Sequence, residues 1–164
     1  MGQIHSTGVP VAELVWRPAD RPGFDGTLLL DTHIWVWMLD GSLDRCSRAL
    51  GPILTRAAGR GQLLVSEFSF WEIAQKEAAG RLTLTMPVEA WIDRAIRVPG
   101  IRYLPVDRAA LVTSTRLTAL PGDPADRILV AAAKLEGAAF VTADRAITAF
   151  AKKDGATAVC DARR

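Results

Sequence analysis

The stretch LLLDTHIWVW, at residues 28–37, decides the fold because an apolar run leads directly into a carboxylate and then into a helical pattern. The run within residues 27–31 predicts a buried strand that ends at Asp31, and residues 32–41 predict a short helix that Gly41 closes. A buried carboxylate without a partner is costly. Asp31 must therefore reach solvent or be paired with another group.

The remaining sequence continues this alternation of short apolar runs and helical patterns. Further strands are predicted at residues 62–66, 101–106, 138–142 and 156–160. Helices are predicted at residues 42–61 (one or two helices), 66–80, 86–100, 107–120, 122–137 and 143–153. Such alternation predicts an α/β fold in which helices cover both faces of a parallel sheet.

Length and composition fit one domain of a reduced, cytoplasmic protein. The chain has 164 residues, 49% hydrophobic and 23% charged, and its net charge of +2 is only weak support for an anionic partner. Its two cysteines and two histidines match no zinc site. No segment has the ~18 apolar residues of a membrane span or the pattern of a signal peptide. We expect an N-terminal arm at residues 1–26, flexible in character, a folded domain at 27–160 and a C-terminal tail at 161–164.

Four acidic residues are predicted at one edge of this sheet. Asp31 ends the first strand, and Asp144 follows the fourth strand by two residues. Glu72 lies in the first half of the helix after the second strand, and Asp126 lies in the first turn of the helix at 122–137. Ligands of parallel α/β sheets bind outside the carboxyl ends of the strands. Carboxylates without histidine or cysteine suit hard cations, so the cluster predicts a magnesium or manganese site.

Each acid also has an ordinary structural explanation. Asp31 and Asp144 could cap the helices that follow them. Glu72 could form a surface pair with Lys76, and the helix dipole could favour Asp126. Taken singly the residues leave the choice open, and only their joint placement favours a site.

Other chemistries lack their characteristic residues. The chain has no Gly-rich phosphate loop, no dinucleotide-binding fingerprint and no G-x-S-x-G elbow. His33 has no evident catalytic partner, so it is predicted at a helix surface or at the rim of the site.

Large aromatic side chains gather in the helices after the first two strands. They are Trp35, Trp37, Phe68, Phe70 and Trp71. Packing in the core or at an interface is their default role, ahead of stacking on RNA. Two short helices can hardly bury all of this apolar surface, so part of it is predicted to be exposed and available to a partner.

Four segments resemble, in order and at sensible spacing, the motifs of PIN-domain proteins, and specifically of VapC-type toxins of bacterial toxin–antitoxin pairs. They are LLLDTHIWVW, VSEFSFWEIAQKEAAGRL, GDPADRILVAAAKLEG and FVTADRAI, and the resemblance runs from about residue 27 to residue 160. It implies a three-layer α/β/α fold with a parallel sheet of four to five strands. It also implies an endoribonuclease that needs Mg²⁺ or Mn²⁺, a homodimer, and a VapB-like antitoxin whose tail wraps the toxin. The long arm before residue 27 departs from such toxins, which usually begin almost at the first strand.

The resemblance also assigns roles to residues of this chain. The catalytic, metal-binding acids of the family fall on Asp31, Glu72, Asp126 and Asp144. Asp123, which also suits the N-cap of its helix, matches a further acid and is a secondary metal candidate. Thr32 and Thr142 match small hydroxyl positions beside the metal.

This interpretation explains why a strand would end on Asp31. Two carboxylates ~4 Å apart repel by about 4 kcal/mol at an effective dielectric of 20. A divalent cation reverses that repulsion and lowers the pKa of a water that attacks phosphorus in line, which leaves a 5′-phosphate product. Arg127 and Arg145 are candidates for holding backbone phosphates, although a generic surface role is the simpler explanation.

Two alternatives compete with a ribonuclease toxin. A haloacid-dehalogenase-type phosphatase also begins with an apolar strand that ends in Asp, but it needs a second Asp two residues later, where this chain has His33. A non-catalytic binding module with the same fold is the second alternative. The complete set of acids counts against it, because a degenerate site should have lost one.

Overall fold

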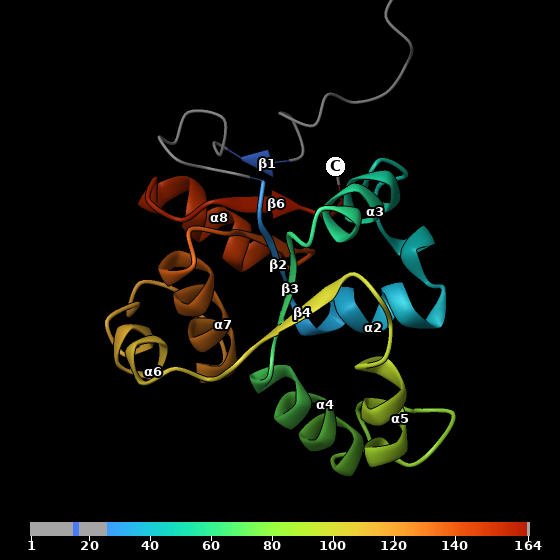
Figure 1. Cartoon of the computed structure of the whole chain (residues 1–164). Helices are drawn as coiled ribbons and strands as arrows, with labels where there is room; N and C mark the ends of the chain where they lie inside the picture. The colour runs from blue at the N-terminus through green and yellow to red at the C-terminus, as the bar shows by residue number, and fades with distance from the viewer. Residues whose placement is uncertain (1–14, 17–25, 164) are drawn as a thin grey trace, which may run out of the picture.

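A sheet of five parallel strands runs through the middle of the protein. The structure is a computed structural model, and it describes residues 15–16 and 26–163. The order across the sheet is β1-β6-β5-β2-β3-β4, and the short β1 joins the edge antiparallel to β6 (Figure 1). The strands are β1 (Val15–Trp16), β2 (Leu28–Leu30), β3 (Leu63–Ser66), β4 (Ile101–Leu104), β5 (Ala139–Thr142) and β6 (Val159–Asp161).

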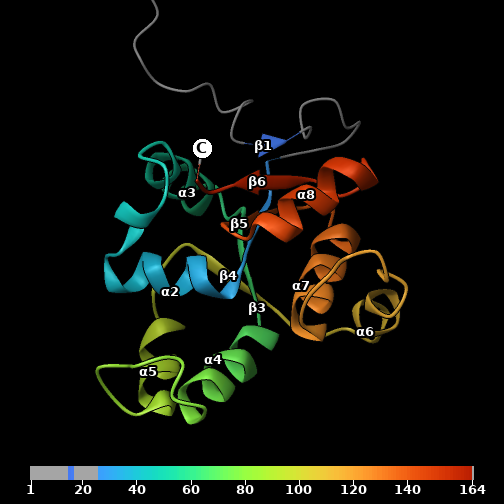
Figure 2. The same cartoon turned by 180° about the vertical axis from the view of Figure 1, so that it is seen from behind.

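Helices follow each of the strands β2 to β5 and lie on both faces of the sheet (Figures 1 and 2). They are α2 (Thr32–Asp40), the 3₁₀ turn η1 (Leu43–Arg45), α3 (Leu50–Gly59), α4 (Phe68–Ala78), α5 (Val88–Ala95), α6 (Arg108–Ser114), α7 (Pro124–Leu135) and α8 (Arg145–Asp154). Within the described residues, none of these helices is long and apolar enough to cross a membrane.

The alternation of side chains along the strands divides the core into two layers. Leu28 and Leu30 of β2 pack into one buried cluster with residues of α2 and α3. Leu29, between them, packs into a second cluster with residues of α7 and α8. Successive side chains of a strand point to opposite faces, so a fully apolar strand needs helices on both sides. The predicted three-layer α/β/α fold with four to five parallel strands is confirmed.

Two helices stop earlier than their sequence patterns predict. The helix predicted at 107–120 ends at Ser114, whose hydroxyl donates to the carbonyl of Leu111 at 2.7 Å, while Thr115 donates to Val112 at 2.8 Å. Such bonds from side chain to backbone compete with the helical ladder. The helix predicted at 86–100 ends at Ala95, five residues before Gly100, which has φ +87°.

The predicted terminal segments lie partly outside the residues that the structure describes. Most of the arm at residues 1–26 lies outside the described residues. Its residues Val15 and Trp16 form β1 and pair with Cys160 and Val159 of β6. At the other end, β6 continues to Asp161, one residue beyond the predicted strand.

The order of the strands creates a switch point beside β2. From β2 the chain proceeds outward to β3 and β4, and it then returns to place β5 on the other side of β2. The crossovers therefore diverge at the carboxyl ends of β2 and β5, where open α/β sheets form their ligand crevice. Asp31 follows β2 directly at this place.

Candidate active site

Asp31 is a buried carboxylate with two partners. It occupies the N-cap position of α2, but its side chain makes no capping hydrogen bond. Its Oδ2 instead accepts a 2.6 Å hydrogen bond from Thr142 Oγ1, and its Oδ1 lies 3.2 Å from His33 Nδ1. Only 3% of Asp31 is exposed. Helix capping therefore does not explain this residue, whereas polar partners across the switch point satisfy its charge.

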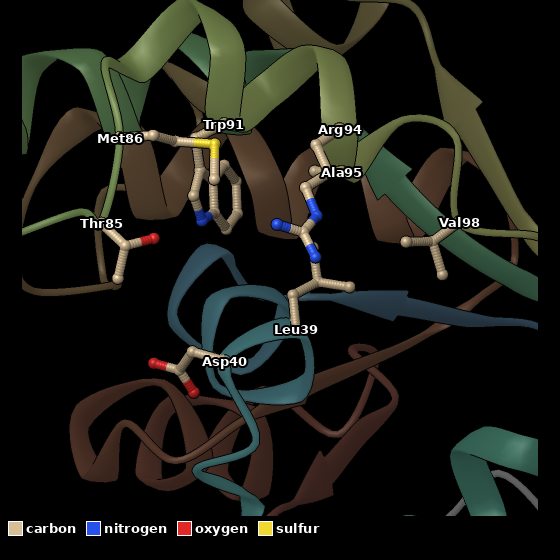
Figure 3. Close-up of a pocket in the computed structure, with 8 residues that line it drawn as sticks. All are labelled: Leu39, Asp40, Thr85, Met86, Trp91, Arg94, Ala95 and Val98. Atoms are coloured by element: carbon tan, nitrogen blue, oxygen red, sulfur yellow. The ribbon is translucent and has the colours of Figure 1, made fainter.

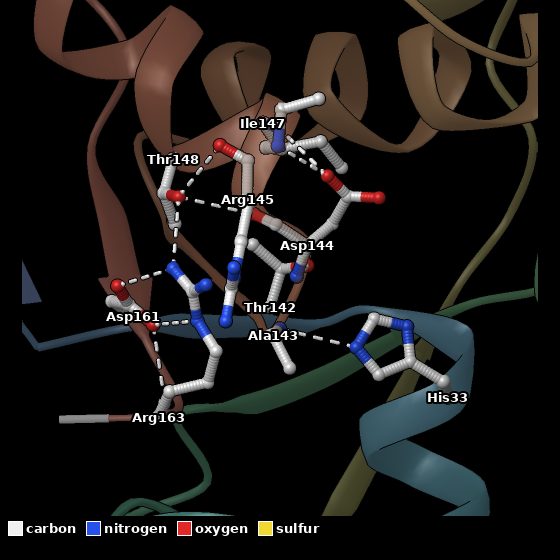
Figure 4. A network of polar contacts seen from close by, with 10 residues as sticks. His33, Thr142, Ala143, Asp144, Arg145, Ile147, Thr148, Asp161 and Arg163 are labelled. Atoms are coloured by element: carbon white, nitrogen blue, oxygen red, sulfur yellow. Dashed lines mark hydrogen bonds and ion pairs between the residues drawn. The ribbon is translucent and has the colours of Figure 1, made fainter.

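His33 links α2 to the loop that carries Asp144. Its Nε2 accepts a 3.1 Å hydrogen bond from the backbone N–H of Ala143 (Figure 4). A ring nitrogen that accepts carries no hydrogen, so a ring hydrogen lies on Nδ1, which faces Asp31 Oδ1 at 3.2 Å. The side chain is 27% exposed, which agrees with the predicted place at the rim.

Two side chains contact the carboxylate of Glu72 in α4. One carboxylate oxygen forms an ion pair with Lys76, and the other accepts a hydrogen bond from Thr32 Oγ1. Thr32 Oγ1 also lies 2.9 Å from Ser69 Oγ. The ion pair with Lys76 exists, as the sequence suggests. Only 5% of Glu72 is exposed, however, so this is not an ordinary surface pair. Ser69 was not predicted, although it precedes Glu72 by three residues and so lies on the same helix face.

The pKa of Asp126 reflects the burial and the negative charge at this edge of the sheet. Its pKa is raised to about 6, first by burial and then by the negative charges of Asp31, Glu72, Asp144 and Asp123 in that order of importance. Three acids from separate segments, and Asp123 from the same helix start, thus act on one carboxyl group.

Asp123 is the outermost of the five acids. It is exposed, and its side chain caps α7 by accepting a 3.0 Å hydrogen bond from Ala125 N. Its influence on the pKa of Asp126 is the smallest of the four charges. Its capping role is therefore established in the structure, and a metal role would be secondary.

Asp144 combines a capping role with a place beside Asp31. Its Oδ1 accepts hydrogen bonds from Ala146 N at 2.6 Å and Ile147 N at 3.2 Å, which caps α8 (Figure 4). Its own backbone N–H donates to Thr142 Oγ1 at 3.0 Å. Thr142 therefore touches both acids, in the position that the resemblance gives to a small hydroxyl beside the metal.

The acids lie at one edge of the sheet, but their carboxylates do not converge on a single point. In the described part of the chain, no three His, Cys, Asp or Glu side chains are close enough to enclose an ion. Glu72 forms an ion pair with Lys76, and Asp144 caps the start of α8. The chemistry of the set still fits a hard divalent cation, because every donor is an oxygen and crowded negative charge raises the pKa of Asp126.

The two arginines considered as phosphate contacts differ in their surroundings. Arg127 Nε donates to the carbonyl of Leu120 at 3.1 Å, so it fastens the loop before α7. Arg145 is exposed at the first position of α8, directly after Asp144. Only Arg145 remains available to an anion beside the acids.

The aromatic residues separate into a core group and an exposed group. Trp35 is fully buried and packs against Phe70 and Trp91, with ring centroids 5.7 and 5.3 Å away. Trp71 is 53% exposed and contacts only the partly buried Phe68 among the described rings, at 5.2 Å. The prediction that part of this aromatic surface is exposed is confirmed at Trp71.

A cavity of about 340 Å³ opens between the end of α2 and α5 (Figure 3). Trp91 and Met86 line one side, and the side chain of Arg94 lies across from Leu39 (Figure 3). None of the five candidate acids lines it. This cavity is therefore separate from the acidic edge of the sheet.

Comparison with known proteins identifies the family. The profile of the PIN domain matches residues 28–153. This chain belongs to the PIN domain family. Membership of this family replaces the phosphatase alternative. The matched residues begin at the strand that leads into Asp31. The chain is also 30% identical to Ribonuclease VapC22 of Mycobacterium tuberculosis over 117 residues, which cover 71% of this chain and 85% of that protein.

Solved structures share the fold of this PIN domain. VapBC2 from Rickettsia felis, bound to a DNA fragment from their promoter, aligns with a TM-score of 0.57 at 14% identity, over 81% of this chain and 96% of that chain. DNA-bound VapBC from Salmonella typhimurium aligns with a TM-score of 0.55 at 16% identity, over 74% and 90% of the two chains. At these identities the likeness shows the fold alone.

Proposed function

We propose that this PIN-domain protein is an endoribonuclease, the toxin of a toxin–antitoxin pair, and that it hydrolyses RNA phosphodiester bonds with Mg²⁺ or Mn²⁺. The observation that carries the proposal is the gathering of carboxylates at the switch point of the sheet, where burial and the neighbouring negative charges together raise the pKa of Asp126 to about 6. The 30% identity to a protein named a ribonuclease supports the choice of RNA as substrate.

The residues that would hold the cation are the four inner acids, with Asp123 at the periphery. The inner acids are Asp31, Glu72, Asp126 and Asp144. When bound, a divalent cation lowers the pKa of an attacking water and stabilises the charge that develops on the phosphoryl group.

The chain's own residues prepare these carboxylates. Thr142 donates to one oxygen of Asp31 and His33 Nδ1 lies 3.2 Å from the other, so the plane of this carboxylate is restricted. Thr32 and Lys76 do the same for Glu72. Carboxylates whose rotation is restricted in this way lose less freedom when they bind a ligand, which is the advantage of a supported site.

Asp126 has a second part in this proposal. With a pKa of about 6, its carboxyl group holds a proton in mildly acidic solution and is ionised above it. Its charge therefore changes a little below neutral pH, within the proposed site. It can orient a water or take up a proton there, while the better supported Asp31 and Glu72 hold their positions.

The proposed partners are RNA, a VapB-like antitoxin and a second copy of the chain. The complexes that share the fold contain VapB with VapC and DNA, which supports an antitoxin that also binds DNA. A basic side chain of such an antitoxin would compete with the cation for the carboxylates. The exposed Trp71 offers apolar surface for an interface. We expect the pair to act in the cytoplasm, where its RNA substrate is found.

Metal-dependent cleavage of RNA by the purified protein tests the proposal. Wild-type protein should cut single-stranded RNA with Mg²⁺ or Mn²⁺ and should stop when EDTA is added. Asp31→Asn should abolish cleavage and keep the fold, because it removes charge but little volume. Asp93→Asn, at an exposed position of α5, is the matched control and should cut normally. Cleavage by Asp31→Asn at a rate near that of wild type would refute the site, and binding of RNA without any cleavage would favour the binding-module alternative.

A further inference from the structure

A buried carboxylate beyond the proposed metal site fixes an arginine at the same edge of the sheet. Asp161 ends β6 next to Thr142 in the strand register, and 6% of it is exposed. Its Oδ1 accepts from Arg163 Nε at 2.9 Å, and its Oδ2 accepts from Arg163 Nη2 at 2.8 Å (Figure 4). Nη2 also donates to Thr148 Oγ1 of α8 at 3.2 Å. Two elements therefore hold one guanidinium in a single orientation.

This arrangement leaves part of the guanidinium available. The Nη1 group of Arg163 has no hydrogen-bond partner among the described residues, and 30% of the side chain is exposed. An arginine fork held by a carboxylate loses little conformational entropy when its remaining donors bind an oxyanion. Arg163 is thus preorganised in a way that a free surface arginine is not.

A second arginine lies at the start of α8. Arg145 follows Asp144, is exposed, and has no hydrogen-bond or ion-pair partner among the described side chains. Figure 4 shows its side chain extending from the start of α8 toward the guanidinium of Arg163. The hydrogen bond to Asp161 raises the pKa of Arg163 most, and the charge of Asp144 contributes as well, which places Arg163 within electrostatic reach of the acidic site.

Positive charge beside this acidic edge solves a problem of binding. Crowded carboxylates repel an RNA strand, whose phosphates are negative at every step. A cation at the acids offsets this only locally, so the neighbouring phosphates need positive charge of their own.

We propose that Arg163 and Arg145 are positioning residues that bind an RNA backbone phosphate next to the one that is hydrolysed. The proposal rests on the ribonuclease function proposed above and adds the side of the site on which the strand lies. The strand would leave the acids over the start of α8 and the end of β6. These contacts fix register and orientation and carry no sequence preference of their own.

A purely structural role for Arg163 makes different predictions. Its bonds to Asp161 and Thr148 would then serve only to fasten the end of β6 to α8. Loss of Arg163 would lower the melting temperature, but it would leave the salt dependence of RNA binding unchanged. Arg145 has no such contact, so a structural role does not apply to it.

The test is the salt dependence of RNA binding, measured with the full chain in an Asp31→Asn background that does not cleave. The probe is a fluorescein-labelled single-stranded RNA of mixed sequence, followed by fluorescence anisotropy over a range of salt concentrations. The variants are Arg163→Gln, Arg163→Lys, Arg145→Gln and the double Gln variant. Arg56→Gln is the matched control. Arg56 is exposed in the last turn of α3, which leads into the amino end of β3, whereas the acids lie at the carboxyl ends of the strands.

Each Gln substitution should weaken binding several-fold and reduce the slope of log K against log salt by about 0.7, the value for one lost phosphate contact on a single strand. Arg163→Lys should keep the slope but bind less tightly, because lysine lacks the fork. Unchanged slopes in folded Arg145→Gln and Arg163→Gln proteins, or an equal loss in Arg56→Gln, would overturn the proposal. Because cleavage is absent from this assay, failure here leaves the nuclease test untouched, and failure of that test does not alter these slopes.

Discussion

Thr142 Oγ1 donates a 2.6 Å hydrogen bond to Asp31 Oδ2 and accepts one of 3.0 Å from the backbone N–H of Asp144. One hydroxyl group therefore connects the ends of β2 and β5 with the start of α8. Its hydrogen is committed to Asp31, because its oxygen already accepts from Asp144. Thr142 is fully buried, so the bond to Asp31 forms away from competing water, whereas the bond from Asp144 is partly buried.

Replacing this hydroxyl should affect stability and cleavage together. Thr142→Val keeps the shape but leaves a buried N–H and a carboxylate oxygen without their partner, which costs about 1–3 kcal/mol of the free energy of unfolding. The RNA cleavage rate should fall as well, because Asp31 is free to rotate. Thr142→Ser is the control and should recover most of both. Chemical denaturation and a cleavage assay measure the two effects, and normal cleavage by Thr142→Val would show that Asp31 needs no such support.

Local sequence signals predicted the elements of this site better than its contacts. The strand that ends at Asp31, the cap at Asp123 and the helix of Glu72 each follow from neighbouring residues. The bond between His33 and Ala143 joins residues 110 positions apart, and its existence depends on how β2 and β5 pair. No local pattern specifies that register, and for the same reason the fork of Arg163 on Asp161 was not predicted. The resemblance to VapC-type toxins supplied Thr142, which periodicity alone would have left as one more strand residue.

The raised pKa of Asp126 predicts a distinct dependence of stability on pH in metal-free buffer. Its folded-state pKa of about 6 lies above the ordinary value of 3.8, so folding favours the protonated form. The contribution is complete below the ordinary value and is lost as the pH rises through about 6. The side chain of Asp126→Asn cannot ionise at this position. The melting temperature of this variant should therefore rise relative to that of wild type as the pH is raised across this window. A constant difference between the two proteins at all pH values would contradict the crowding of charge around Asp126.

Binding of the proposed cation should stabilise the fold. A ligand that binds only the folded state at a hundredfold excess over its Kd contributes about 2.7 kcal/mol. The melting temperature should therefore rise with Mg²⁺ or Mn²⁺, and Glu72→Gln should reduce the rise, because it removes a buried charge that only Lys76 balances among the described ion pairs. Glu89→Gln, at an exposed position of α5, should leave the rise unchanged. Melting curves that are indifferent to both metals up to millimolar concentrations would refute the metal site.

Gly122 leaves space for the carboxylate of Asp126. A Cβ at this position would lie 3.0 Å from Asp126 Oδ2, and the backbone has φ +112°, where side chains are unfavourable. Gly122→Ala should destabilise the fold by about 1 kcal/mol or more and should lower cleavage by displacing Asp126. Gly137→Ala controls for the backbone effect, since Gly137 has φ +64° and a Cβ there meets no atom within 4 Å. Equal cleavage by the two variants would show that the position of Asp126 is unimportant.

An antitoxin that inhibits through a basic side chain should bind the acids themselves. Asp31 and Asp144 sit at adjacent strand ends, and the double variant Asp31→Asn, Asp144→Asn removes both charges with little change of shape. Asparagine is also a good N-cap, so the start of α8 that Asp144 now caps should survive. We expect the antitoxin encoded beside this chain to bind the double variant more weakly than wild type, with a larger difference at low salt, because charge pairs are screened as salt increases. Titration calorimetry measures the affinities, and light scattering tests the expected dimer in the same samples. Equal affinities at all salt concentrations would rule out competition at the carboxylates and leave the nuclease proposal standing.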